Sequence, residues 1–318
     1  MSWVDDFLSL YISSEIENHM KALELKRSHL PTKLYRYRSL KNKENIESEV
    51  CKGEIFLAPP SVMNDPYDSR SILGSYSPSV YIKNKKEFEK RFSKSMDKST
   101  FDKIFNSNEW MDNLVQYIAG KYASTNEVEK AKSDVLRILM QQLEQLNLSI
   151  NKVINETSRF ACFTEKPTNL PMWSHYADGH TGICLEYNIT SISNIYITNR
   201  LFPIRYVDKL PDGTSFLVHN RLPSYSFCDY FLAHKLKDWS YEKEWRLIYD
   251  VGSWYLRPED VPADFWNHGK LIKFIMPSKV FLGAKISRID EDTVKQWCEK
   301  AHISIEKMKC TEYGLIAE

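Results

Sequence analysis

The sequence lacks three features that would assign a protein to a class at once: an excess of charge, clustered cysteines and a long apolar run. Its 43 Lys and Arg residues against 42 Asp and Glu residues leave a net charge of +1. No overall field would therefore concentrate the protein on nucleic acid or anionic lipid, although a local basic groove is compatible with this balance. The six cysteines are scattered, without CxxC or Cys/His spacing, which predicts free thiols and argues against a metal site or a disulfide scaffold.

Hydrophobic residues make up 42% of the 318 residues, which is enough for a sizeable core in one elaborated domain or two intimate ones. No stretch approaches the ~20 apolar residues of a membrane span. The amino terminus, Met1–Asp6, also lacks the basic and apolar regions of a secretion signal. We therefore expect a cytoplasmic protein that has no membrane partner.

The amino-terminal region has the periodicity of an amphipathic helix. Apolar residues recur at steps of three and four over Trp3–Arg27, and Pro31 ends the pattern. Two short β-like runs follow, Lys33–Arg38 and Glu54–Ala58, joined by a charged segment that is compatible with a short helix. The sequence thus predicts an N-terminal helix within residues 1–30 and then a strand–helix–strand unit.

A helical insertion is predicted at about residues 83–150, where polar and charged residues dominate and leucines such as Leu136, Leu139, Leu143 and Leu146 have helical spacing. β-like runs then return, at Arg159–Thr164, Gly182–Tyr187, Trp245–Val251, Ile272–Met276, Lys279–Leu282 and Ile303–Lys307. We expect an α+β fold in which residues 31–318 form a single domain, with a mixed, mostly antiparallel core sheet that is discontinuous in sequence around the insertion.

The first strand carries a pair of candidate phosphate ligands. Strand alternation places Tyr35 and Tyr37 on one face and Arg36 and Arg38 on the other. Two neighbouring guanidiniums suit a phosphate group. The alternative is a sheet edge with a solvated charged face, because exposed arginines are common.

The loop Pro59–Asp68 is rigid and rich in turn-forming residues. Loops of this kind often border binding sites, which makes Ser61 and Asn64 candidate ligand contacts. A purely structural turn, in which Asn and Asp side chains cap backbone groups beside a proline, is the alternative.

An aromatic and hydroxyl-rich stretch follows the insertion, over Phe160–Glu165 and Met172–Gly182. In it, Trp173, His175 and Tyr176 could form a wall for a planar ring and donate hydrogen bonds to a sugar. Core packing of the aromatic residues around a satisfied histidine is the alternative. The neighbouring Ser174 and His175 give weak evidence for a nucleophile, because adjacent side chains usually point apart.

The segment Trp239–Arg246 contains the catalytic candidates. If Tyr241–Ile248 is extended, Glu242 and Glu244 share one face with Arg246. One carboxylate can then polarise a ribose hydroxyl while the other orients or deprotonates a nucleophile. The alternative is a Glu-Lys-Glu-Arg ladder of salt bridges on a surface strand, which would contribute little stability.

These segments together resemble a large bacterial domain-of-unknown-function family. The resemblance rests on a Y-x-Y-x-S start at Tyr35, an N-D-P turn at Asn64, a W-S-H-Y-A-D block at Trp173 and a W-S-Y-E-K-E-W-R block at Trp239. It covers most of the chain from Leu34 to about Gly283, and it implies little about activity.

A second similarity, to ADP-ribosyltransferases of the Arg–Ser–Glu type, implies a function. Arg36, Phe163-Thr164 and Glu242-Lys243-Glu244 occur in the order of that family's three motifs, although Phe-Thr-Glu replaces the usual aromatic-Ser motif. The resemblance implies a split-sheet core in which Arg36 contacts NAD, Thr164 supports the pocket, Glu244 stabilises an oxocarbenium-like transition state and Glu242 positions the acceptor. A related subgroup has His-Tyr where this chain has Arg36-Tyr37. With the segments above, the predicted contacts to NAD are Arg36, Tyr37, Arg38, Ser61, Asn64, Thr164, Trp173, His175 and Tyr176.

The leading hypothesis is therefore an ADP-ribosyltransferase-like toxin or anti-phage effector. It would use NAD as substrate and modify RNA, DNA or protein, with nucleic acid slightly favoured because Arg36, Arg38, Lys235 and Lys237 lie among aromatic residues. A neutralising antitoxin or regulatory protein would be its partner. Two rivals stay open: a nuclease or other hydrolase that uses His175 and His180, and a sensor that binds a nucleotide or a partner without catalysis.

Overall fold

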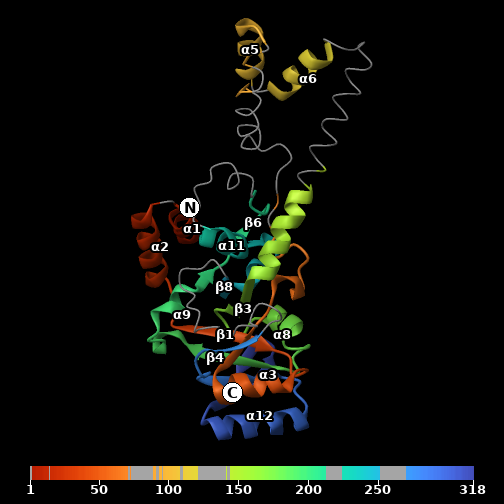
Figure 1. Ribbon diagram of the computed structural model, residues 1–318. Helices are drawn as coiled ribbons and strands as arrows, with labels where there is room; N and C mark the ends of the chain where they lie inside the picture. Colours follow the sequence, from red (N-terminus) through yellow and green to blue (C-terminus); the bar gives the residue numbers. More distant parts are fainter. Residues whose placement is uncertain are drawn as a thin grey trace. The chain divides into compact units, whose positions relative to one another are not determined.

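The computed structural model describes residues 2–13, 15–70, 72, 89–90, 93–94, 96–107, 110–120, 141, 144–212, 224–250 and 270–318. The chain divides into two compact units, of which the first comprises residues 1–70, 154–210 and 222–318 and the second residues 71–153 and 211–221. The first unit contains the main sheet (Figure 1). Among the described residues, no helix is long and apolar enough to cross a membrane.

The main sheet has the order β12-β11-β10-β4-β1-β3-β8-β5. Its strands are β1 (Lys33–Arg38), β3 (Ser158–Thr164), β4 (Ile183–Asn188), β5 (Leu201–Pro203), β8 (Glu244–Asp250), β10 (Lys279–Leu282), β11 (Ser304–Thr311) and β12 (Gly314–Ala317). All neighbouring pairs are antiparallel except β10 with β11. The prediction of a mixed α+β fold with a mostly antiparallel sheet is confirmed.

The described part of this unit also contains two short two-stranded sheets. One pairs β2 (Glu54–Leu57) with β9 (Lys270–Lys273), and the other pairs β6 (Arg205–Val207) with β7 (His234–Leu236). The predicted strand–helix–strand unit is present as β1, α3 (Lys43–Lys52) and β2, with Gly53 in the left-handed conformation (φ 62°) between helix and strand. The predicted strand at Ile272–Met276 stops at Lys273.

Helices cover both faces of the main sheet. On one face, α3 packs beside α12 (Arg288–Ala301), and Ile46, Val50 and Trp297 join the core formed with strand residues such as Leu185 (Figure 1). On the other face, α8 (Leu170–Tyr176) packs on β1, with Trp173 in a separate apolar cluster. Alternation along β1 therefore points its arginines towards α3 and its tyrosines towards α8.

The amino terminus forms two helices, α1 (Trp3–Tyr11) and α2 (Ile16–Ser28), where one helix over Trp3–Arg27 was expected. Helix α1 ends at Tyr11 with Ile12 as its C-terminal cap, and the Ser13 hydroxyl then accepts a hydrogen bond from the backbone N–H of Glu15. Such local side-chain bonds compete with helix continuation, which the apolar periodicity does not report.

Other described helices of the first unit include η1 (Pro60–Val62), η2 (Ile189–Ser191), α9 (Ile195–Asn199), α11 (Ser224–Leu232) and η3 (Lys237–Glu242). In the second unit, the described helices include α5 (Lys98–Phe105) and α6 (Trp110–Gly120), which share an apolar cluster around Phe105 and Trp110. Much of the predicted insertion at about 83–150, including Leu136, Leu139 and Leu143, lies outside the described residues.

The sheet splits between β1 and β3. These strands pair only at Tyr35 and Thr164, and beyond that pair each continues on its other side, β1 with β4 and β3 with β8. At the far end of the split, Ala58 makes a bridge with Phe160. The space between the two strands is the place where the candidate site lies.

Candidate functional site

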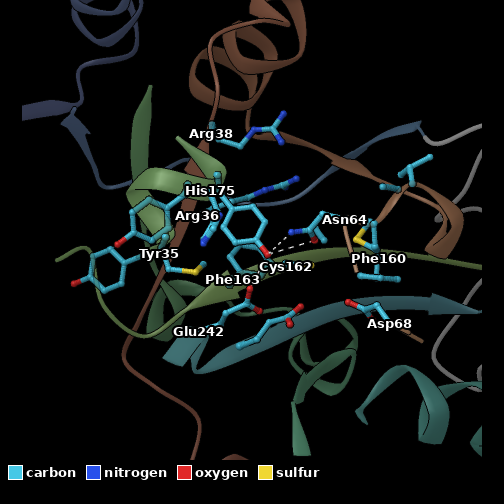
Figure 2. A pocket seen from close by; sticks show the side chains of 18 of the residues that line it. Tyr35, Arg36, Arg38, Asn64, Asp68, Phe160, Cys162, Phe163, His175 and Glu242 are labelled. Carbon is cyan, nitrogen blue, oxygen red and sulfur yellow. Dashed lines mark hydrogen bonds between the residues drawn. The ribbon is translucent and has the colours of Figure 1, made fainter. Parts of the chain in front are cut away.

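A cavity of about 420 Å³ occupies the split (Figure 2). Its volume is in the usual range for small-molecule sites. It is lined by Tyr35, Arg36, Tyr37, Arg38, Phe56, Ala58, Val62, Met63, Asn64, Asp68, Phe160, Ala161, Cys162, Phe163, Met172, His175, Tyr176, Lys235, Glu242 and Glu244. The cavity therefore joins strand, loop and helix segments that are far apart in the sequence.

One side of the cavity carries the two arginines of β1. Arg36 lies 3.4 Å and Arg38 3.3 Å from the Glu49 carboxylate on α3, which also accepts a 2.6 Å hydrogen bond from the Tyr187 hydroxyl. Arg36 donates to the Phe56 carbonyl as well. Two guanidiniums share one carboxylate, so this side keeps an excess of one positive charge. The predicted common face of Arg36 and Arg38 is present, and it is turned to α3.

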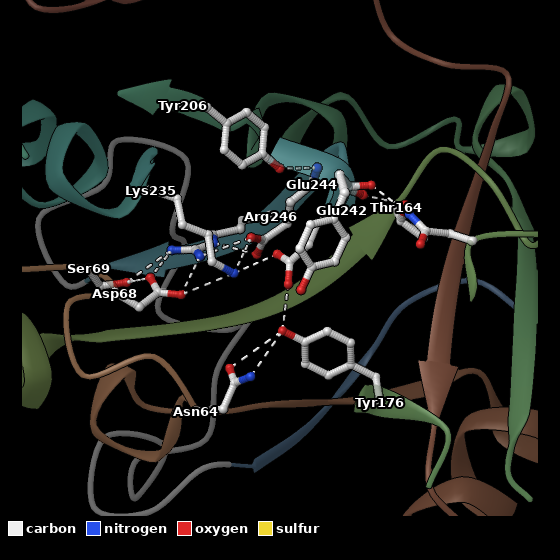
Figure 3. A network of polar contacts seen from close by, with 12 residues as sticks. Asn64, Asp68, Ser69, Thr164, Tyr176, Tyr206, Lys235, Glu242, Glu244 and Arg246 are labelled. Carbon is white, nitrogen blue, oxygen red and sulfur yellow. Dashed lines mark hydrogen bonds and ion pairs between the residues drawn. The ribbon is translucent and has the colours of Figure 1, made fainter. Parts of the chain in front are cut away.

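The opposite side carries a buried network of charges (Figure 3). The Lys235 ammonium lies 2.6 Å from Glu242, 3.2 Å from Glu244 and 3.6 Å from Asp68. Arg246 binds Asp68 through two 2.7 Å hydrogen bonds and Glu244 through bonds of 2.6 and 3.1 Å. All five side chains are buried. Two cations face three carboxylates, which leaves an excess of one negative charge when every group is ionised.

The backbone that carries this network differs from the predicted extended strand over Tyr241–Ile248, and the network is buried, unlike the surface ladder that was the alternative. Lys237–Glu242 forms the 3-10 turn η3, and Lys243 has a left-handed backbone (φ 45°), so β8 begins only at Glu244. Glu242 is thus not on the strand face of Glu244 and Arg246, and Lys235 joins the two glutamates from β7. A left-handed residue in a short turn has no periodic signature in the sequence.

The two glutamates have opposite pKa shifts. Burial, followed by the Glu244 carboxylate, raises the pKa of Glu242 to about 7 despite Lys235. Burial would also raise the pKa of Glu244, but Arg246 and Lys235 outweigh it and hold that pKa well below the ordinary range. Near neutral pH the pair therefore offers one ionised carboxylate and one group that can exchange a proton, the division of roles seen in acid–base sites.

Glu242 leads to a prediction about stability. Because its folded pKa is raised from 4.5 to about 7, the folded state binds this proton more tightly than the unfolded chain does. The resulting stabilisation is fully present below pH 4.5 and is lost as the pH rises through 7. Over this window we expect Glu242 to lower the free energy of unfolding by at most about 1.4 kcal/mol per pH unit.

Urea unfolding at several pH values between 4.5 and 7 tests this. The Glu242→Gln variant should lose the part of the slope that Glu242 contributes. The slope that remains combines Asp229, whose pKa burial raises to about 8, with His234, whose pKa burial lowers to about 4 and which acts in the opposite direction. Equal slopes in the variant and the parent would contradict the raised pKa of Glu242.

Most predicted site residues line the cavity, but three do not. Ser61 is exposed, and its N–H donates to Asn155. Trp173 is a core residue whose indole N–H donates to the Pro167 carbonyl. The Thr164 hydroxyl donates to the Glu242 carbonyl at 2.5 Å, so Thr164 holds the turn that carries Glu242. The observed contacts of Ser61 are those of a structural loop, and the observed contacts of Trp173 are those of a core residue, as the two structural alternatives describe.

Helix α8 and the loop after β2 complete the site. The Tyr176 hydroxyl donates to Glu242 at 2.6 Å, and Asn64 donates to that hydroxyl at 3.3 Å. His175 lines the cavity, whereas His180 does not line it and stacks on Trp173. Of the two histidines named for a hydrolase, His175 alone is in the lining of this cavity.

Sequence analysis named Lys235 only as a cation for a nucleic-acid acceptor and missed its place between the two glutamates, and it did not identify Asp68 as a site residue. Lys235 follows the apolar run Tyr230–Ala233 and a histidine. A lysine beside such a run can indicate a buried ion pair, because lysines are rarely buried unless they are paired. Asp68 sits in the turn-rich loop, where nothing local marks it as an arginine ligand.

All six cysteines are free, as expected. The part of the chain that the structure describes contains no group of three or more His, Cys, Asp or Glu side chains that could hold a metal ion.

The model of a family described as Protein of unknown function (DUF2971) matches residues 172–247. This match confirms the resemblance to a domain-of-unknown-function family, and its range includes most of α8, Lys235 and both glutamates of the network. No curated protein and no solved structure matches the chain.

Proposed function

We propose that this protein is an ADP-ribosyltransferase-like enzyme that cleaves NAD and transfers ADP-ribose to a macromolecule. The observation that carries the proposal is the order β1-β3-β8 in the sheet. It makes neighbours of the three strands bearing Arg36, Thr164 and Glu244, and Thr164 pairs with both Tyr35 and Glu244 across the strands. The resemblance requires these motifs to converge, and the split sheet supports an ADP-ribosyltransferase-like fold.

The charge distribution of the cavity matches that of NAD. Arg36 and Arg38 lie on one side, and Glu242 and Asp68 lie on the other (Figure 2). The side with excess positive charge suits a pyrophosphate. The side with excess negative charge suits the cationic nicotinamide ring, which can stack on the aromatic lining.

The carboxylates would serve two steps of the reaction. As the bond between nicotinamide and ribose stretches, the sugar becomes cationic, and the ionised Glu244 would stabilise it at the cavity wall. Glu242, whose pKa of about 7 suits proton transfer, would orient the acceptor and take its proton. The nicotinamide leaves as a neutral molecule, and the acceptor keeps the ADP-ribose.

A non-catalytic sensor is the second candidate, and one observation favours it. Both Glu244 carboxylate oxygens already accept hydrogen bonds, from Arg246 and Lys235. A carboxylate so fully bonded can serve as a fixed negative charge for binding a cationic ligand without turnover.

The acceptor is macromolecular in this proposal, and a toxin or anti-phage role with a neutralising antitoxin or regulatory partner fits such chemistry.

The cations that favoured a nucleic-acid acceptor offer less free positive charge for binding it than the sequence suggested. Arg36 and Lys235 are buried beside carboxylates, and the exposed Lys237 pairs with Asp208. RNA, DNA and protein are therefore tested side by side.

The decisive experiment supplies NAD labelled in its adenosine half to the purified protein with separate pools of RNA, DNA and protein. We expect label in one pool, with release of one nicotinamide per ADP-ribose transferred. If calorimetry shows that NAD binds but no pool is labelled and no nicotinamide is released, the sensor is correct and the transferase is not. Cleavage of RNA without NAD consumption would instead indicate the hydrolase.

A further inference from the structure

Lys235 is the cation that both candidate glutamates share. Its ammonium is 2.6 Å from Glu242 and 3.2 Å from Glu244, and its side chain is 3% exposed. The ammonium also lies 4.9 Å from the centre of the Trp239 ring, a cation–π contact that helps to hold it in place. No water layer separates this charge from the carboxylates, so its effect on them is strong.

The two glutamates differ in how much they depend on Lys235. Glu244 has a second cationic partner in Arg246, which holds it through two hydrogen bonds. Glu242 forms its ion pair with Lys235 and otherwise accepts from the neutral Tyr176 hydroxyl. Removing the ammonium would therefore leave Glu244 still paired with Arg246, and Glu242 would face the negative charge of Glu244 without an ion-pair partner among the described residues.

We propose that Lys235 is a positioning residue that acts through the glutamates: it allows Glu242 to lose its proton beside the ionised Glu244, so that the two carboxyl groups can serve different steps. The inference rests on the proposed transferase function for its catalytic meaning. The titratable, charged and hydrogen-bonding groups around Glu242 are Tyr176 on α8, Asn64 and Asp68 on the loop after β2, Cys162 on β3, Tyr206 on β6, Lys235 on β7, Tyr241 on η3, and Glu244 and Arg246 on β8.

The kinetic test compares Lys235→Met with Lys235→Arg, and Lys309→Met is the control. Methionine keeps an unbranched stem over Trp239 but carries no charge, whereas arginine restores the charge. We expect Lys235→Met to lower kcat for NAD consumption by about 10–100-fold, with little change in KM. The acid limb of its pH profile should move up by about one pH unit or more, since a carboxylate without its cation holds its proton more tightly.

Lys235→Arg should restore the parent pH profile at least in part. Lys309 on β11 does not line the cavity, is exposed and pairs with Glu318 at 3.0 Å, so Lys309→Met should leave kcat and the profile unchanged. A lowered kcat with an unmoved acid limb in Lys235→Met would overturn the proposal, because a merely structural role predicts that result.

A second measurement does not need activity. The carboxyl carbon of Glu242 is titrated by NMR in the variants Glu244→Gln and Glu244→Gln/Lys235→Met. Both variants lack the negative charge of Glu244, so the fold tolerates the loss of the Lys235 cation more easily. The pKa of Glu242 should be about one unit or more higher in the double variant. An equal pKa in the two proteins overturns the role of Lys235. If the parent protein consumes no NAD, the proposed function fails, and this titration still decides on Lys235.

Discussion

Replacing Glu244 with Gln should lower the rate of ADP-ribose transfer by about 10²–10³-fold, the usual effect of removing one preorganised electrostatic group from a transition state. The side chain keeps its volume, while the negative charge that would stabilise the cationic sugar is lost. The measurement is the initial rate of nicotinamide release at saturating NAD. Rates are divided by the folded fraction, because Glu244 also binds Arg246 and Lys235 and its neutralisation will lower the melting temperature.

The matched control for this substitution is Asp68→Asn. Asp68 meets the same two cations, Arg246 at 2.7 Å and Lys235 at 3.6 Å, so its neutralisation disturbs the same network. The proposal gives Asp68 no contact with the reacting sugar, and we expect Asp68→Asn to keep at least about a tenth of the parent rate. Equal losses in the two variants would mean that Glu244 acts only as a structural member of the network.

The sequence predicted the parts of this site that follow strand periodicity. Alternation along β1 correctly placed Arg36 and Arg38 on one face, since six successive residues pair with β4 in regular register. It could not show that the face meets Glu49 on α3, because that contact depends on how the helix returns over the sheet. The faces of a strand are local properties, whereas the partner of each face is set by packing.

The prediction of the catalytic candidates had the same limit: the sequence showed which residues to consider but not how the chain places them. The Glu242 and Glu244 pair was found by residue type and spacing, and the assumed extended geometry was wrong at Lys243. The carboxylates are nevertheless close in space, because Lys235 bridges them from a strand that sequence analysis did not predict. Short strands such as β7 carry too few residues for their alternation to be recognised.

Replacing Arg246 with Met should destabilise the fold by about 3–5 kcal/mol, the range measured when one partner of a buried ion pair is removed. Arg246 is 0% exposed and donates to Asp68, Glu244, Ser69 and the Leu232 carbonyl. Its removal leaves Asp68 and Glu244 with only Lys235 as a cation, and Lys235 also serves Glu242. Such a loss is a large share of the 5–15 kcal/mol that usually holds a domain folded.

Urea unfolding at neutral pH measures this loss, with Lys41→Met as the control. Lys41 pairs with Asp178 at a comparable 2.8 Å, but its side chain is 77% exposed, so its loss should cost less than about 1 kcal/mol. The variant Arg246→Met/Asp68→Leu should recover part of the stability, because it removes one of the two carboxylates that the single change leaves short of a cation. If Arg246→Met is no less stable than Lys41→Met, the network does not hold the β8 side of the cavity together. The charge pattern proposed to select NAD would then lack its structural support.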